Sequence, residues 1–139
     1  MFRVTQDGWI SSSHQLRLDD GLLEPLHGHN WRIQVAIEAD ELDERGLVID
    51  LERLAAILTD VLDGLDHVHL NDLPVFRKRP VSAENVARHI ADTIAAIVDD
   101  GRRRLAEVRV WMTEEQSASY ARQASTPAGT RTTGGSVGG

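Results

Sequence analysis

The sequence contains no cysteine, and aromatic residues account for only 4% of its 139 residues. The absence of thiols excludes disulfides, thiolate zinc ligands and a cysteine nucleophile. No apolar run approaches the length that spans a membrane, and the N-terminal stretch MFRVTQDGWI lacks the apolar segment of a secretory signal. We therefore expect a cytoplasmic protein that does not associate with membranes.

Positive charge is also scarce, because 15 Lys and Arg residues stand against 22 Asp and Glu residues, for a formal net charge of −7. A protein that binds nucleic-acid backbones needs a basic face, so this balance argues against nucleic acid as a partner. The chain length fits one domain with a real core. We expect a folded domain over residues 1–123 and, because residues 124–139 are small, polar and glycine-rich, a disordered tail after it.

Three segments have the pattern of β-strands. Residues 2–11 carry apolar side chains around Asp7 and Gly8, which predicts a strand with a turn or bulge at that dipeptide. Residues 31–39, WRIQVAIEA, alternate apolar and polar side chains, which is typical of a half-buried strand. Residues 107–113, EVRVWMT, predict a last clear strand.

Two segments between these strands have the pattern of amphipathic helices. Asp50 and Ser82 are each suited to cap a helix N-terminus, and apolar residues follow each of them at three- and four-residue steps. His89 falls on the polar side of the second helix, where we expect a solvated side chain. The order of strands and helices indicates an α+β fold with helices on one face of an antiparallel sheet.

The segment LHGHN contains a possible half of a metal site. His27 and His29 are two residues apart at the start of a strand, so both side chains leave the same face. His14, at the end of the first strand, is the candidate third ligand, and three histidines with an open position are typical of catalytic zinc. Taken alone, the pattern also fits polar residues at the mouth of a strand.

Six short segments together resemble the family of 6-pyruvoyl-tetrahydropterin and 6-carboxytetrahydropterin synthases. They occur in family order and, with Tyr120, extend the resemblance over about residues 2–120, which indicates a divergent member of this family. The segments are SSSH (11–14), EPLHGHNW (24–31), GLVIDL (46–51), LDHVHLN (65–71), PVSAENVA (80–87) and VRVWMT (108–113).

The resemblance implies the tunnelling fold, which is an antiparallel four-stranded sheet with two helices on one face, assembled into an oligomeric barrel. It implies a homo-hexamer built as a dimer of trimers, with a small-molecule substrate bound between subunits. It further implies that His14, His27 and His29 hold Zn²⁺, and that Asp66 and His67 form part of a proton relay. Without the resemblance, Asp66 and His67 could equally be a polar helix exit.

The sequence departs from the family at the proton relay. The family has a cysteine four residues before the first histidine of HGH, and this chain has Leu23 there, which cannot transfer a proton. Glu24 follows directly and is a candidate catalytic base, since some family branches place a glutamate in this stretch and cleave the side chain of dihydroneopterin triphosphate by a retro-aldol step. A solvated loop residue is the alternative interpretation of Glu24.

A second departure affects the substrate-binding residues that the resemblance implies. Met112 occupies the position of the glutamate that anchors the pterin in the family, and Glu114 could replace it only if the strand continues beyond Thr113. Ser82 belongs to the segment near the pocket, where Val81 replaces the usual threonine. The basic run Arg77–Arg79 could bind a phosphate or could simply be solvated.

These observations favour a zinc-dependent carbon–oxygen or carbon–carbon lyase of the 6-pyruvoyl-tetrahydropterin synthase type. Its substrate would be dihydroneopterin triphosphate or a related compound whose side chain is cleaved. Met112 keeps two alternatives open, namely a diverged member that acts on a non-pterin substrate and a non-catalytic zinc-binding oligomer.

Overall fold

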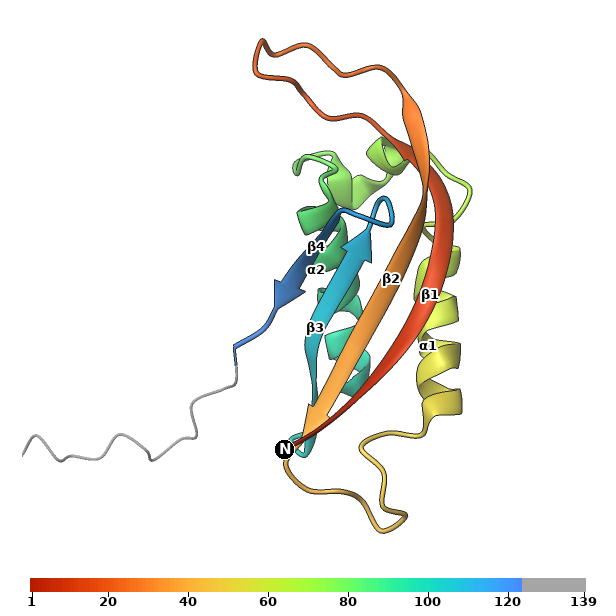
Figure 1. Cartoon of the computed structure of the whole chain (residues 1–139), viewed down its shortest axis with the longest axis vertical. Helices are drawn as coiled ribbons and strands as arrows, with labels where there is room; N and C mark the ends of the chain where they lie inside the picture. The colour runs from red at the N-terminus through yellow and green to blue at the C-terminus, as the bar shows by residue number, and fades with distance from the viewer. Residues whose placement is uncertain (124–139) are drawn as a thin grey trace, which may run out of the picture.

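The structure is a computed structural model that describes residues 1–123, so the tail predicted at residues 124–139 lies outside the described residues (Figure 1). Within the described part, four strands and two α-helices follow one another, with two short 3₁₀-helices between the α-helices. The elements are β1 (Phe2–His14), β2 (His27–Ala39), α1 (Leu51–Asp63), the 3₁₀-helices Leu70–Asp72 and Pro74–Phe76, α2 (Ala83–Val98), β3 (Arg103–Trp111) and β4 (Ser117–Ala121).

The four strands form one antiparallel sheet in the order β1-β2-β3-β4. Both helices cover the same face, α1 against β1 and α2 against β3 and β4, which confirms the predicted α+β arrangement (Figure 1). The predicted strand patterns reappear as β1, β2 and β3, while the short β4 was expected only from the family resemblance, which implies a fourth strand. The outer edges of β1 and β4 have no neighbouring strand within residues 1–123.

The turn or bulge predicted at Asp7 and Gly8 is wrong. β1 runs through both residues, and Asp7 and Gly8 pair regularly with Gln34 and Ile33 of β2. Gly8 is there because helix α1 packs closely on the strand: a Cβ at this position would lie 2.6 Å from Leu62 Cδ1. The register shift of the sheet falls elsewhere, between β2 and β3 at Ala36.

The helices begin where the sequence predicts. The Asp50 side chain accepts a hydrogen bond from the Glu52 N–H, and the Ser82 side chain accepts one from the Asn85 N–H, so each caps its helix. The apolar faces of the helices and the inward face of the sheet enclose one core. Its largest fully buried side chains include Trp31, Ile33, Leu54, Ile90 and Leu105.

A long arm extends the hairpin of β1 and β2 beyond the rest of the domain. Residues 15–26 form this arm, and Figure 1 shows it projecting past the ends of β3 and β4. At its base the Glu24 N–H donates to the Leu16 carbonyl, the Leu16 N–H donates to the Glu24 side chain, and a bridge joins Arg17 and Leu23. Exposed apolar side chains gather on the arm, namely Leu18, Leu22, Leu23 and Leu26.

Among residues 1–123, the helices are too short or too polar to cross a membrane.

Candidate metal centre

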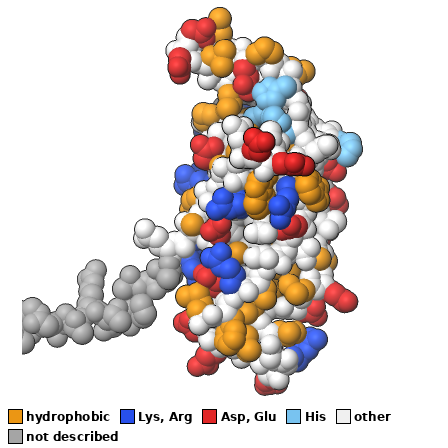
Figure 2. All heavy atoms as spheres, viewed as in Figure 1, with side chains coloured by type: hydrophobic (Ala, Val, Ile, Leu, Met, Phe, Trp, Pro, Cys, Tyr) orange, Lys and Arg blue, Asp and Glu red, His pale blue; other side chains and the backbone are white. Residues whose placement is uncertain are grey.

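Three histidines converge where the hairpin of β1 and β2 opens into the arm. His14 is the register partner of His27 on the neighbouring strand, and His29 lies two residues further along the same face of β2. The ring centroids are 4.7 to 5.2 Å apart, and one ligand nitrogen from each ring lies within 4.8 Å of the others. The structure therefore brings together the three ligands that the sequence predicted, and Figure 2 shows histidine side chains reaching the surface beside the arm.

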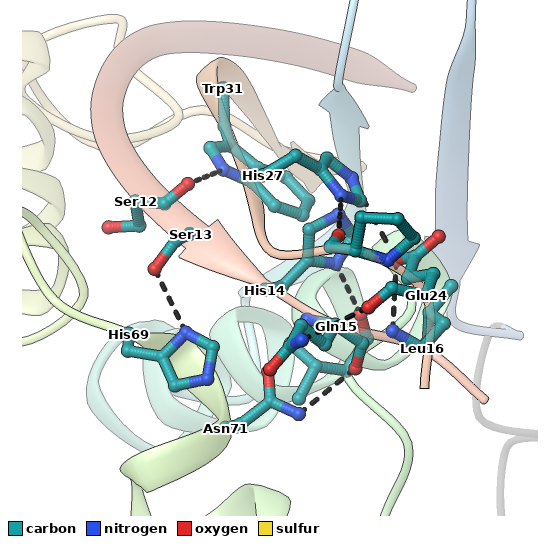
Figure 3. A network of polar contacts seen from close by, with 12 residues as sticks. Ser12, Ser13, His14, Gln15, Leu16, Glu24, His27, Trp31, His69 and Asn71 are labelled. Carbon is teal, nitrogen blue, oxygen red and sulfur yellow. Dashed lines mark hydrogen bonds and ion pairs between the residues drawn. The ribbon is translucent and has the colours of Figure 1, made fainter. Parts of the chain in front are cut away.

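Backbone carbonyls fix the orientation of two of these rings. The Nδ1 atom of His14 lies 2.8 Å from the Val81 carbonyl oxygen, and that of His27 lies 3.0 Å from the Pro25 carbonyl oxygen (Figure 3). A carbonyl oxygen only accepts hydrogen bonds, so each Nδ1 carries the proton and each Nε2 keeps a free lone pair. Metal-binding histidines are commonly held in this way.

The Nε2 atom of His14 is the strongest indication that the three histidines are suited to hold a metal ion. His14 is only 2% exposed, and its Nε2 atom is fully buried without a hydrogen-bond partner within the described residues. Buried polar atoms are nearly always paired, because an unpaired one loses its interaction with water. A metal ion shared with His27 and His29 would satisfy this atom, so the donor set fits a three-histidine metal site.

Burial also favours the protonation state that a metal requires. Desolvation lowers the pKa of His14, and the neighbouring His27 lowers it further, although the hydrogen bond to Val81 opposes the effect. Desolvation lowers the pKa of His29 as well, with a contribution from His14. Both imidazoles are therefore neutral at pH 7, which is the form that binds metals.

Trp31 forms the buried wall beneath the cluster. Its ring lies edge-on to His14 at 4.8 Å and to His29 at 5.3 Å between centroids, and its Nε1–H donates to the Ser12 carbonyl at 3.0 Å. The fully buried indole limits the movement of both histidines. This packing keeps the ligand nitrogens close together before any ion binds.

Glu24 reaches the cluster from the arm. Its Oε1 lies 3.8 Å from Nε2 of His27, the nitrogen left free for a metal, and it accepts the Leu16 N–H at 2.9 Å (Figure 3). The side chain is 20% exposed, which is more consistent with a site residue than with the solvated loop residue that the sequence left open. Leu23, by contrast, is half-exposed on the arm and offers no group that transfers protons.

A hollow of about 560 Å³ lies beside the cluster, with His29 in its wall. The loop after α1 contributes His67, Val68 and His69 to the wall, and the strands contribute Ser11, Ser12, Ser13, Gly28 and Asn30. One chain thus brings a predicted metal ligand and a predicted proton-relay residue to the same hollow. This is room for a small-molecule substrate.

Asp66 and His67 do contact each other, which their adjacency alone could not establish. The Asp66 Oδ1 lies 2.8 Å from Nδ1 of His67 and also accepts the Ser11 N–H at 2.8 Å. The Ser11 hydrogen bond lowers the pKa of Asp66, with a further contribution from His67, so the carboxylate stays ionised. His67 has a φ of 56°, which is rare for a residue other than glycine, and its side chain is 79% exposed.

His69 is a residue of the hollow that the sequence analysis did not single out. Its Nδ1 lies 2.9 Å from the Ser13 hydroxyl oxygen, and a parallel bridge joins the two residues (Figure 3). The Asn71 side chain fixes the same loop by accepting the Gln15 N–H and donating to the Gln15 carbonyl. The polar run SSSH was the available signal, because it lines the strand that this loop meets.

The residues predicted to bind substrate are not among those that line the hollow. Strand β3 ends at Trp111, so Glu114 lies in the exposed turn before β4 and does not share the strand face with Met112. Met112 is partly buried against the core and donates its N–H to the Gln116 carbonyl. The Ser82 hydroxyl is engaged as the cap of α2, where it accepts the Asn85 N–H at 3.1 Å.

His89 is not the solvated residue that the helix pattern predicted. It is half-buried in α2, with its ring edge-on to Phe76 at 5.8 Å between centroids. Desolvation lowers the pKa of His89. The prediction was wrong because the 3₁₀-helices between α1 and α2 fold over this side of α2, which the pattern of α2 alone does not reveal.

Comparisons with known proteins agree with this geometry. The family model described as 6-pyruvoyl tetrahydropterin synthase matches residues 3–123. The 6-pyruvoyl tetrahydrobiopterin synthase of Dictyostelium discoideum is 31% identical over 129 residues, which cover 84% of this chain and 93% of that protein. The 6-carboxy-5,6,7,8-tetrahydropterin synthase of Bacillus subtilis is 29% identical over 118 residues, which cover 81% of this chain and 79% of that protein.

Solved structures show the same fold. The 6-pyruvoyl tetrahydropterin synthase of Caenorhabditis elegans aligns with a TM-score of 0.73 at 23% identity, over 88% of this chain and 96% of that chain. The enzyme of Plasmodium vivax aligns with a TM-score of 0.72 at 19% identity, over 88% and 98% of the two chains. From the family match over nearly all described residues, the chain belongs to the 6-pyruvoyl tetrahydropterin synthase family.

Proposed function

We propose that this protein is a zinc-dependent lyase that cleaves the side chain of dihydroneopterin triphosphate or a closely related compound. The observation that carries the proposal is the buried, unpaired Nε2 of His14, which faces two further imidazoles within 4.8 Å. Zn²⁺ is the metal we propose, because it suits three imidazole ligands and leaves a position open for substrate. Bound there, it would polarise an oxygen of the substrate side chain.

Glu24 is the base in this proposal. Its carboxylate lies 3.8 Å from Nε2 of His27, where a hydroxyl of a substrate side chain bound beside the three histidines would come within its reach. Two of the Plasmodium vivax synthase structures carry substitutions of a glutamate that is described as a catalytic residue, which is consistent with a glutamate base in a protein of this fold. Leu23 makes a thiol-based reaction impossible at the neighbouring position.

In a retro-aldol cleavage, one of these residues removes a proton from the substrate and another returns one. Glu24 removes the proton of a side-chain hydroxyl, the adjacent carbon–carbon bond breaks, and that oxygen becomes the carbonyl of the departing aldehyde. The carbon that remains on the ring then takes a proton, which His67 supplies from across the hollow. Asp66, ionised and hydrogen-bonded to Nδ1 of His67, orients this ring.

We further propose that the active protein is a cytoplasmic homo-oligomer, a dimer of trimers in which the sheets join into the barrel of the tunnelling fold. Unpaired strand edges favour pairing with another chain, and both β1 and β4 have such an edge within the described residues. The exposed leucines of the arm add apolar surface beside the metal centre, which a neighbouring subunit would cover.

Met112 supports a second candidate, a family member whose substrate is not a pterin. A buried glutamate at this position would bind ring N–H groups, and Met112 leaves such donors without a partner. Glu114, in the exposed turn, is not placed on the strand face where it could take over. In this case the metal centre and Glu24 act on the polyol side chain of another compound.

A turnover assay with mass-spectrometric detection tests the proposal. Zinc-loaded protein is incubated with 7,8-dihydroneopterin triphosphate, and wild type is compared with Glu24→Gln, which keeps the shape of the side chain but cannot accept a proton. We expect a 6-hydroxymethyl product from wild type and a loss of roughly 10²–10⁴-fold in the variant. No product from protein with confirmed zinc would reject the pterin substrate, and equal rates would reject Glu24 as base.

A further inference from the structure

A second hollow, of about 480 Å³, lies between the base of the arm and the segment that leads into α2. Four cationic side chains line it: Arg17 from the arm, and Arg77, Lys78 and Arg79 from the facing segment. Its wall within the described chain contains no Asp or Glu side chain. The same wall includes apolar groups, of which Leu16, Leu23 and Phe76 are examples.

These four cations differ from most basic residues of the protein. Elsewhere in residues 1–123, seven arginines pair with carboxylates, as Arg32 does with Asp7 at 2.8 Å and Arg122 with Asp99 at 2.8 Å, while Arg53, Arg88 and Arg102 do not. The four cations of this hollow form no ion pair of this kind within the described chain. The chain as a whole has a formal net charge of −7, so a hollow lined by cations without carboxylate partners differs in sign from the rest of the protein.

We propose that this basic hollow binds a phosphate-bearing anion. Guanidinium groups present several N–H donors in a planar fork that matches phosphate oxygens, and a lysine adds a point charge. A simple solvated run would explain Arg77, Lys78 and Arg79, but it does not explain why Arg17, from a different part of the chain, lines the same hollow. Nη1 of Arg17 donates to the Gly21 carbonyl at 2.8 Å, and the other N–H groups of its guanidinium remain as donors for an anion. Cations from two segments of the chain that line one cavity are suited to an anion with several charges.

The hollow lies next to the metal centre, and Val81 connects the two. Gln15 and Val81 line the hollow, and the Val81 carbonyl accepts the hydrogen bond from Nδ1 of His14. The anion would therefore lie on the Nδ1 side of His14, whereas the free Nε2 of the same ring faces His27 and His29. Two sources offer the required chemistry: the phosphate chain of the substrate, or a separate phosphorylated molecule.

The anion site itself does not depend on the reaction proposed above, and only its assignment to the substrate's phosphates does. Isothermal calorimetry with inorganic tripolyphosphate tests it on the full-length, zinc-loaded protein, with zinc content measured before and after because polyphosphates chelate zinc. Arg77→Glu is compared with Arg53→Glu. Arg53 is an exposed residue of α1 outside the hollow, so both variants change the net charge equally.

We expect wild type and Arg53→Glu to bind tripolyphosphate alike, and Arg77→Glu to bind about 10- to 100-fold more weakly, as for the loss of one charged hydrogen bond. No binding by wild type, or equal weakening in both variants, would overturn the site. If KM for the phosphorylated substrate rises in Arg77→Glu alone, the substrate is the source. Unchanged kinetics with lost tripolyphosphate binding would identify a separate phosphorylated ligand.

Discussion

Two histidine-containing regions face each other across the hollow beside β2, and they are built differently. The first is the ligand cluster, in which two rings are fixed by backbone carbonyls and Trp31 closes the floor. The second is the pair of Asp66 and His67, in which the histidine side chain is 79% exposed. One region is preorganised by the core of the chain, while the other lies on a loop that hydrogen bonds to Ser11 fasten to β1.

The difference indicates which part of the chemistry a single chain can complete. The ligand cluster has its geometry, the tautomers of His14 and His27 and the lowered pKa values of His14 and His29 without help from a second molecule. The Ser11 backbone and the Asp66 carboxylate hold His67 in position, but its side chain is exposed to solvent. Proton transfer is more efficient in a site that excludes water, so covering His67 is the step that assembly would supply.

The largest effect is expected from removing the most buried ligand. His14→Ala should reduce the zinc content from about one ion per chain to nearly none and abolish turnover, because two imidazoles do not retain a three-ligand metal. Elemental analysis together with circular dichroism measures metal and fold separately. His89→Ala is the matched control, and equal zinc loss in that variant would contradict the assignment of His14.

Substitution of His67, the exposed histidine, should reduce turnover without affecting metal binding. His67→Asn preserves the positive φ, which asparagine tolerates, but removes the proton-transfer group. We expect turnover to fall by roughly 10²–10⁴-fold with zinc content unchanged. If zinc leaves together with activity, the two regions are not independent and the role given to His67 is wrong.

Restoring a carboxylate at the pterin anchor is expected to have a moderate effect. Met112→Glu should lower the KM for a pterin substrate about tenfold, because the ring N–H groups regain a charged acceptor. Met112→Leu keeps the site apolar and should leave KM unchanged. An unaltered KM in the glutamate variant would show that substrate recognition does not use this position.

The smallest effect concerns His89, a half-buried histidine that lies outside both regions. Desolvation lowers its pKa below the ordinary value of 6.5, so the folded chain binds fewer protons here than the unfolded chain. The stability contributed by its neutral form is complete above pH 6.5 and decreases as the pH falls below it. Thermal melts from pH 7.5 to 5 should decline less steeply in His89→Gln, and parallel curves would rule out this contribution.

The convergence of His14, His27 and His29 could be predicted from the sequence because the geometry follows from local rules. Side chains two residues apart on a strand share a face, which places His27 and His29 together. The position of His14 required only that β1 and β2 pair in antiparallel register, which a long apolar alternation favours. The caps at Asp50 and Ser82 were equally local, and the structure confirms both helix starts.

Features that depend on contacts between distant segments were not predictable in the same way. The straight course of β1 at Gly8 reflects the packing of Leu62, and the burial of His89 reflects the 3₁₀-helices above it. The participation of His69 in the hollow depends on the loop that Asn71 fastens to β1. In each case the deciding partner lies more than a dozen residues away in the chain.

The register that joins His14 to His27 also has a consequence for chain connectivity. The two ligands are paired directly across the hairpin, so the tip of the arm, beyond Arg17 and before Leu23, does not set the distance between them. Residues can be inserted, deleted or even cut at this tip without shifting the ligand atoms. The arm can therefore diverge in length and composition, and acquire new contacts, while the chemistry at its base stays the same.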